Sequence, residues 1–109
     1  AELQEKHLNL EIARLVRSME PFGPGNEEPI FVLRNTRLQK YDVMGQDKQH
    51  LSLTIGNGRP VRGAFFNAAS RSRELVGVRN VDIAFTLGES DWNGPKLDMH
   101  IKDFRVASS

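Results

Sequence analysis

The fold is decided by residues 50–66, HLSLTIGNGRPVRGAFF, in which two short runs of apolar and polar residues flank a turn. Residues 50–56 alternate with a period of two, which is typical of a half-buried strand. The Gly56-Asn57-Gly58 run favours the backbone conformations of a tight β-hairpin. We therefore expect a second strand at 60–66, paired with the first.

Further strands are expected on both sides of this hairpin. Residues 30–43 predict one long, bent strand, and residues 81–87 predict another. The last strand, 97–106, changes parity near Lys102-Asp103, which indicates a bulge. A short helix is expected at 68–75, between the third and fourth strands.

This element order predicts a mainly β protein: a five-stranded OB-fold barrel with an N-terminal α-helix before it. The short helix between strands 3 and 4 belongs to the same pattern. Other small barrels and a β-meander share the order of elements, so they stay open as alternatives.

The segment before the barrel has helical periodicity. Its apolar residues at helical spacing are Leu8, Ile12, Leu15, Val16 and Met19. The helix must end before Pro21, because proline disfavours helical geometry at the preceding residue. The run PFGPGN at 21–26 predicts an ordered loop. We divide the chain into a linker helix and loop at 1–29 and an OB-fold domain at 30–109.

Length and composition indicate one globular domain, with 109 residues of which 39% are hydrophobic and 27% are charged. Cysteine is absent, which excludes disulfide scaffolds and thiolate chemistry. No apolar run approaches the roughly 18 residues of a membrane span, so we expect no membrane contact and a cytoplasmic location. Because the chain does not begin with methionine, we expect it to be a piece of a longer protein.

Charge is distributed unevenly along the chain. Residues 34–79 hold nine basic and three acidic side chains, whereas residues 1–33 hold three and six, and residues 80–109 hold three and five. The basic middle predicts a basic face. Its excess is too small to drive tight nucleic-acid binding through phosphate neutralisation alone. A solvated surface with locally paired charges is the alternative.

No catalytic or metal centre is predicted. His7, His50 and His100 lie far apart in the sequence, without the spacing of metal ligands. The GPG run at 23–25 is no phosphate-binding loop, because proline lacks an amide donor and a strand follows instead of a helix. We therefore expect no cofactor of the chain's own.

The predicted fold supplies a candidate binding face. OB-folds commonly bind oligonucleotides on their second and third strands and on two loops, here 45–49 and 89–95. Single-strand binders combine cations that follow the phosphates with flat rings that stack on bases. Strand parity points one set outward, namely His50, Ser52, Thr54, Arg62 and Phe66. The candidate nucleic-acid-binding residues are Arg37, Lys40, Tyr41, Lys48, His50, Arg62, Phe66, Trp92, Asn93 and Lys96.

Several of these residues have a structural alternative. Phe65 and Phe66 are adjacent, so either one could be the inward ring. Trp92 could stack on a base or pack over the barrel mouth, and Tyr41 could be structural. Arg37 and Lys40 are spaced by three residues, which does not place both on one face of a strand.

The motifs together resemble a known family. The run PFGPGN at 21–26 is followed by PIF at 29–31, HLSL at 50–53, FN at 66–67 and WNG at 92–94. In this order they resemble the OB domain of RecJ-type single-stranded-DNA-specific exonucleases, over nearly the whole chain. Ser52 departs from the pattern, because the family often has lysine there.

The resemblance implies a fragment of a 5′–3′ exonuclease of DNA repair and recombination. In that family, manganese or magnesium is held by Asp-His-His and partner domains whose motifs this sequence lacks. The implied role is to bind single-stranded DNA and guide it to the catalytic domains of the same polypeptide, with no metal site and no nuclease activity in this chain.

Three other functions remain open. The chain could be a docking module that binds no DNA, in which case the helix would carry an exposed apolar stripe at Leu8, Ile12 and Leu15. It could be a stand-alone OB protein that binds RNA or single-stranded DNA. A small hydrolase is the most remote alternative.

Overall fold

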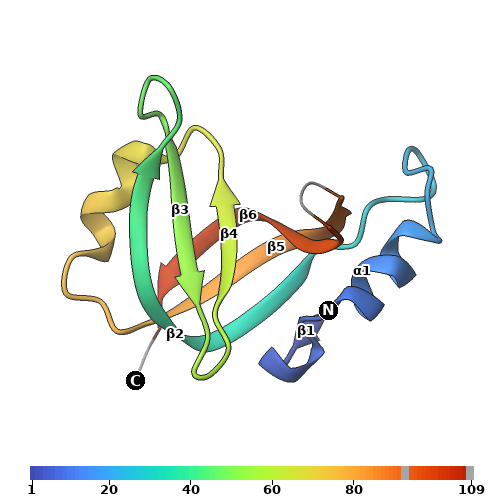
Figure 1. Ribbon diagram of the computed structural model, residues 1–109, viewed down its shortest axis with the longest axis horizontal. Coiled ribbons are helices and arrows are strands. Elements are labelled where there is room, and N and C mark those ends of the chain that lie inside the picture. The colour runs from blue at the N-terminus through green and yellow to red at the C-terminus, as the bar shows by residue number, and fades with distance from the viewer. Residues whose placement is uncertain (92–93, 108–109) are drawn as a thin grey trace.

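The computed structural model describes residues 1–91 and 94–107. Before the barrel lie a short strand, a 3-10 turn and a helix: β1 (Glu2–Leu3), η1 (Glu5–His7) and α1 (Leu10–Arg17). The barrel follows as β2 (Phe31–Met44), β3 (His50–Ile55), β4 (Val61–Phe65), the 3-10 helix η2 (Ala69–Leu75), β5 (Asn80–Ser90) and β6 (Lys96–Val106). In Figure 1 the N-terminal segment and η2 lie on opposite sides of this barrel.

The strands form the predicted five-stranded barrel, and the barrel is closed. They follow the order β2-β3-β4-β6-β5, and a further pairing of β2 with β5 closes the ring. The β4–β6 pair is parallel, and the other pairs of the barrel are antiparallel. The predicted OB-fold, including the short helical connection between its third and fourth strands, is confirmed.

Three register shifts shape the barrel. The long strand β2 pairs first with β5 and then with β3, and its register shifts between Leu33 and Thr36 against β5 and between Leu38 and Lys40 against β3. Asn35 lies in the first of these shifts with φ of 52°, and its amide donates to Asp82 Oδ1 at 2.7 Å. On β6, the residue Lys102 is left without a register partner between Ile101 and Asp103. The bent first strand and the late bulge were both predicted.

The core fills the barrel interior. The inward residues of β3 are Leu51, Leu53 and Ile55, and none of them is exposed. Gly63 lies where β4 pairs with β6, and a Cβ there would be 2.8 Å from Ile101 Cδ1. The absence of a side chain at this position therefore allows the close approach of the two strands.

The N-terminal segment departs from the prediction at its start. The helix begins at Leu10, although helical periodicity already starts at Leu8, because Asn9 caps it by accepting from the Ile12 amide at 3.1 Å. Residues 2–3 form a strand on β2, which was not predicted. The ordered loop at 21–26 is confirmed, since the Asn26 side chain donates to two backbone carbonyls at 2.8 Å. Within the described residues, no helix is long and apolar enough to cross a membrane.

Candidate nucleic-acid interface

An exposed aromatic ring lies on the outer side of the β3–β4–β6 sheet. Phe66 directly follows β4 and is 49% exposed. The His50 ring lies edge-on to it at 5.2 Å between centroids, and the His100 ring does so at 5.3 Å. Three strands therefore contribute to one cluster, His50–Phe66–His100, which we call the aromatic face.

The two histidines are held by hydrogen bonds. His50 Nδ1 accepts from the Asn67 amide at 2.9 Å, which in the neutral ring places the hydrogen on Nε2. Asn67 presents this amide from a left-handed conformation, with φ of 60°. His100 Nε2 lies 3.0 Å from Asp98 Oδ2. Both rings are thus fixed against Phe66 before any ligand arrives.

The loop between β2 and β3 is shaped around His50. Gly45 has φ of 100°, and a Cβ there would lie only 2.8 Å from His50 Cδ2. Glycine is favoured here because it tolerates this backbone conformation and leaves room for the ring. The loop that OB-folds use for binding is therefore packed against the aromatic face.

A cation lies on the same side of the sheet. Arg62 is exposed, and its Nε donates to Ser52 Oγ at 2.7 Å while Nη2 lies 3.4 Å from Met44 Sδ. In the part of the chain that the structure describes, no ion pair joins Arg62 to a carboxylate. Its positive charge is therefore offset by no direct acidic partner.

Ser52 lies on the predicted side of β3, but it is only 1% exposed. Its hydroxyl accepts the Arg62 hydrogen bond instead of facing solvent. Ser52 is thus a positioning residue for the guanidinium, a role that the alternation pattern does not reveal.

The adjacent phenylalanines point to opposite sides. Phe65 packs edge-on against Phe104, with 5.9 Å between ring centroids, and is partly buried against the core. The Arg71 guanidinium lies 5.6 Å from the centre of the Phe65 ring. Phe65 is therefore the inner ring and Phe66 the outer one. This is the arrangement that strand parity predicted, and the alternative with Phe66 inward is excluded.

The other candidate residues are more scattered. Lys40 pairs in register with Thr54 and is exposed, as is Lys48 in the β2–β3 loop. Lys96 is exposed at the start of β6. Arg37 pairs with Asn80 of β5, and Tyr41 packs against the core opposite Leu53, so neither joins the aromatic face. Trp92 and Asn93 lie outside the described residues.

Sequence reasoning missed His100 as a member of the site. The residue alternates with the apolar Met99 and Ile101 of the last strand, and it lies on the outer side of β6. Its neighbours come from the parallel β4–β6 pairing, which sets Ala64 opposite His100. No local pattern shows this long-range pairing.

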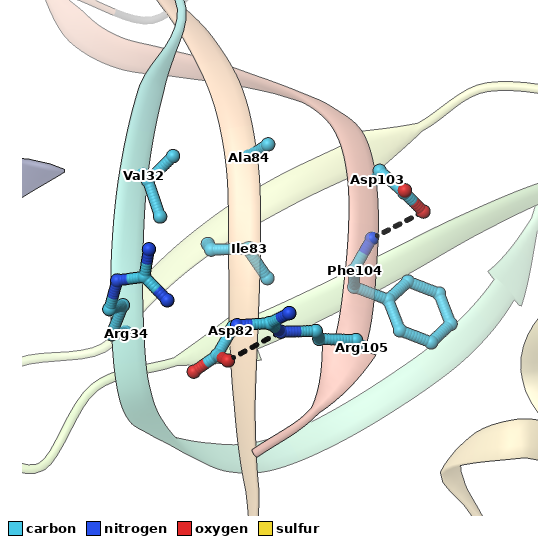
Figure 2. A pocket seen from close by; sticks show the side chains of 8 residues that line it. All are labelled: Val32, Arg34, Asp82, Ile83, Ala84, Asp103, Phe104 and Arg105. Carbon is cyan, nitrogen blue, oxygen red and sulfur yellow. Dashed lines mark hydrogen bonds and ion pairs between the residues drawn. The ribbon is translucent and has the colours of Figure 1, made fainter. Parts of the chain in front are cut away.

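A second outer surface, formed by β2, β5 and β6, has balanced charges (Figure 2). Its shallow groove has a volume of about 220 Å³. Arg105 Nε donates to Asp82 Oδ2 at 2.8 Å and, together with the Asn35 amide, lowers the pKa of the Asp82 carboxyl. The pKa of Asp103 is also lowered, chiefly by its hydrogen bond from Arg71. Each carboxylate already has a cationic partner, so this surface offers little unpaired charge to a nucleic acid.

Within residues 1–91 and 94–107, no group of three or more histidine and acidic side chains is placed to hold a metal ion. Asp98 contacts His100, whereas Asp103 contacts Arg71. The two carboxylates that the last strand contributes are therefore engaged separately.

The closed barrel, its strand order and its aromatic and basic outer face define the chain as an OB-fold module. The chain belongs to the RecJ OB domain family, because the model of that family matches residues 1–103. A comparison with curated proteins gave no match. The chain is thus a nucleic-acid-binding OB-fold module of a RecJ-like protein.

Proposed function

We propose that this chain is the single-stranded DNA-binding module of a RecJ-like 5′–3′ exonuclease, which acts in DNA repair and recombination in the cytoplasm. The observation that carries the proposal is the exposed Phe66 ring, held between two histidines on the same outer side of the sheet as Arg62. The exposure of an apolar ring to water is unfavourable in free energy unless something covers the ring. An unstacked base is a flat ligand of matching size.

The interface would bind one base and phosphates of the same strand. A base stacks on Phe66, which contributes roughly 1–3 kcal/mol and depends little on base identity. Phosphates farther along the strand meet Arg62, with Lys48 and Lys40 available at the β2–β3 side of the face. Duplex DNA keeps its bases stacked inside the helix, so this arrangement favours single strands.

The module would act on a strand that catalytic domains of the same polypeptide cleave. The manganese or magnesium of RecJ-type nucleases would be held by those domains and would supply the hydrolytic chemistry. This chain's residues bind and orient the strand. The N-terminal segment, which hydrogen bonds and packs against the barrel, would link the module to the nuclease core.

The test compares Arg62→Ala with Arg73→Ala, which removes the same charge from exposed η2. Binding of a labelled single-stranded oligonucleotide is followed by fluorescence anisotropy at several salt concentrations. Arg62→Ala should weaken binding and reduce the salt slope by about 0.7, the contribution of one phosphate contact on a single strand. Arg73→Ala should match the wild type. Equal slopes for both variants would count against the interface.

A docking module is the second candidate, and one observation favours it. Leu15 on α1 is 63% exposed and lines an apolar groove with Leu3 and Ile12. The stripe is incomplete, because Leu8 and Ile12 are partly buried against the barrel. If the wild-type chain binds no single strand at low salt, this surface becomes the leading candidate for function.

A further inference from the structure

A second candidate binding site lies between the N-terminal segment and the barrel. This basic groove is lined by residues 8–10, 59–62 and 95–97, and its volume is about 470 Å³. We propose that it binds the phosphodiester backbone of the same single strand whose base stacks on Phe66. The inference rests on the proposed function and extends the path of the strand.

All the charged side chains that line the groove are basic. Arg59, Arg62 and Lys96 line it, and no acidic side chain is among the lining residues. Within the described residues, no carboxylate forms an ion pair with Arg59, which is exposed. The groove of Figure 2 differs, because Arg105 and Asp82 form an ion pair within it. Its other two charged residues also have partners of opposite charge, since Arg34 pairs with Glu2 and Asp103 pairs with Arg71. The basic groove is therefore suited to an anionic ligand.

The groove is continuous with the aromatic face. Arg62 lines the groove and also extends over Ser52 on the outer side of β3. From Arg62 to Phe66 the chain rises by about 13 Å, at roughly 3.3 Å per residue of strand. A ligand that contacts both ends must span this length, so an oligonucleotide fits the two sites together and a mononucleotide does not.

The wall formed by residues 8–10 is fixed before binding. Just upstream, the Glu5 carboxylate accepts from the Asn57 amide at 2.6 Å and from Asn57 Nδ2 at 2.7 Å. This contact joins the N-terminal segment to the β3–β4 turn, which leads directly into Arg59. Because the groove is preformed, binding there requires little ordering of the chain.

The test uses the double variant Arg59→Ala/Lys96→Ala. A matched control is Arg73→Ala/Lys102→Ala, which removes one arginine and one lysine from exposed positions outside the groove. Each protein is titrated into an oligothymidylate of about 16 nucleotides, the upper end of the site size of an OB-fold, and into a thymidine dinucleotide. Urea unfolding midpoints verify that the variants are folded.

We expect the groove variant to lose affinity for the long oligonucleotide. Its salt slope should fall by about 1.4, the contribution of two phosphate contacts on a single strand. Its affinity for the dinucleotide, which reaches only the aromatic face, should match that of the control.

Two outcomes separate the claims. If the wild type binds the long oligonucleotide and the groove variant shows the affinity and slope of the control, the groove inference is wrong and the proposed function stands. If the folded wild type binds neither ligand at low salt, the proposed function and the groove inference both fail.

Discussion

The replacement of Phe66 by alanine distinguishes the contribution of base stacking to binding from the contribution of charge. If a base stacks on this ring, its loss removes roughly 1–3 kcal/mol of binding free energy. Since 1.4 kcal/mol corresponds to a factor of ten, the dissociation constant should rise by about 5- to 140-fold. No charge is removed, so the dependence of affinity on salt should keep its wild-type slope.

The structure also limits the effect of this change on folding. Phe66 is 49% exposed, so its truncation removes about half of the 1.5–3 kcal/mol that a fully buried aromatic side chain contributes. Urea unfolding should therefore show a loss of about 1 kcal/mol. The variant stays folded at room temperature, and its binding can be measured directly.

The assay is fluorescence anisotropy with a labelled single-stranded oligonucleotide, and two controls accompany it. Phe66→Tyr keeps a flat ring and should retain the wild-type affinity. Val76→Ala removes apolar surface at a position that is 72% exposed and outside the interface, and should have no effect. A folded Phe66→Ala variant that binds as tightly as the wild type would refute the stacking argument.

Three further predictions concern the barrel and its chemistry. Gly63→Ala should destabilise the fold by about 1–3 kcal/mol, because the new methyl group meets Ile101; an unchanged urea midpoint would contradict this. Asp82→Ala should cost about 1–3 kcal/mol at neutral pH, because the Asn35 amide loses its acceptor and Arg105 its partner. The pKa of Asp82 is lowered in the folded state, so its contribution is present above about pH 4 and is lost as the pH falls through the folded value. Unfolding measured below pH 4 should therefore depend less on pH in this variant than in the wild type, and equal dependence would show that the ion pair is not responsible. With manganese present, the purified chain should leave single-stranded DNA intact on a denaturing gel, and cleavage that persists through purification would revive a hydrolase.

Much of the barrel followed from local patterns. The alternation of Leu51, Leu53 and Ile55 against polar residues identified β3 and its inner side, because only one face of that strand meets the core. The change of parity near Lys102 located the bulge in β6, since an extra residue reverses the side on which later residues lie.

The N-terminal segment was less predictable. Strand β1 has two residues, and its parallel pairing with β2 is a tertiary contact between segments far apart in sequence. Helical periodicity already begins at Leu8, two residues before the helix itself. The capping side chain of Asn9 sets the observed start.

The binding face was only partly predictable. Strand parity placed Arg62 and Phe66 on the outer side, where the structure has them. It could not show that Arg62 would cover Ser52, because a diagonal contact between strands depends on side-chain conformation. His100 joins the site only through the β4–β6 pairing, which no local spacing encodes.

Binding of single-stranded DNA by this chain is tested most directly by a titration of the wild-type chain into a labelled single-stranded oligonucleotide. It is carried out at about 50 mM and at about 200 mM salt, because phosphate contacts contribute much less to affinity at the higher concentration. We expect saturable binding in the micromolar range at low salt that weakens markedly at high salt. The absence of saturable binding at low salt would contradict this expectation and favour a role for the exposed α1 surface in docking.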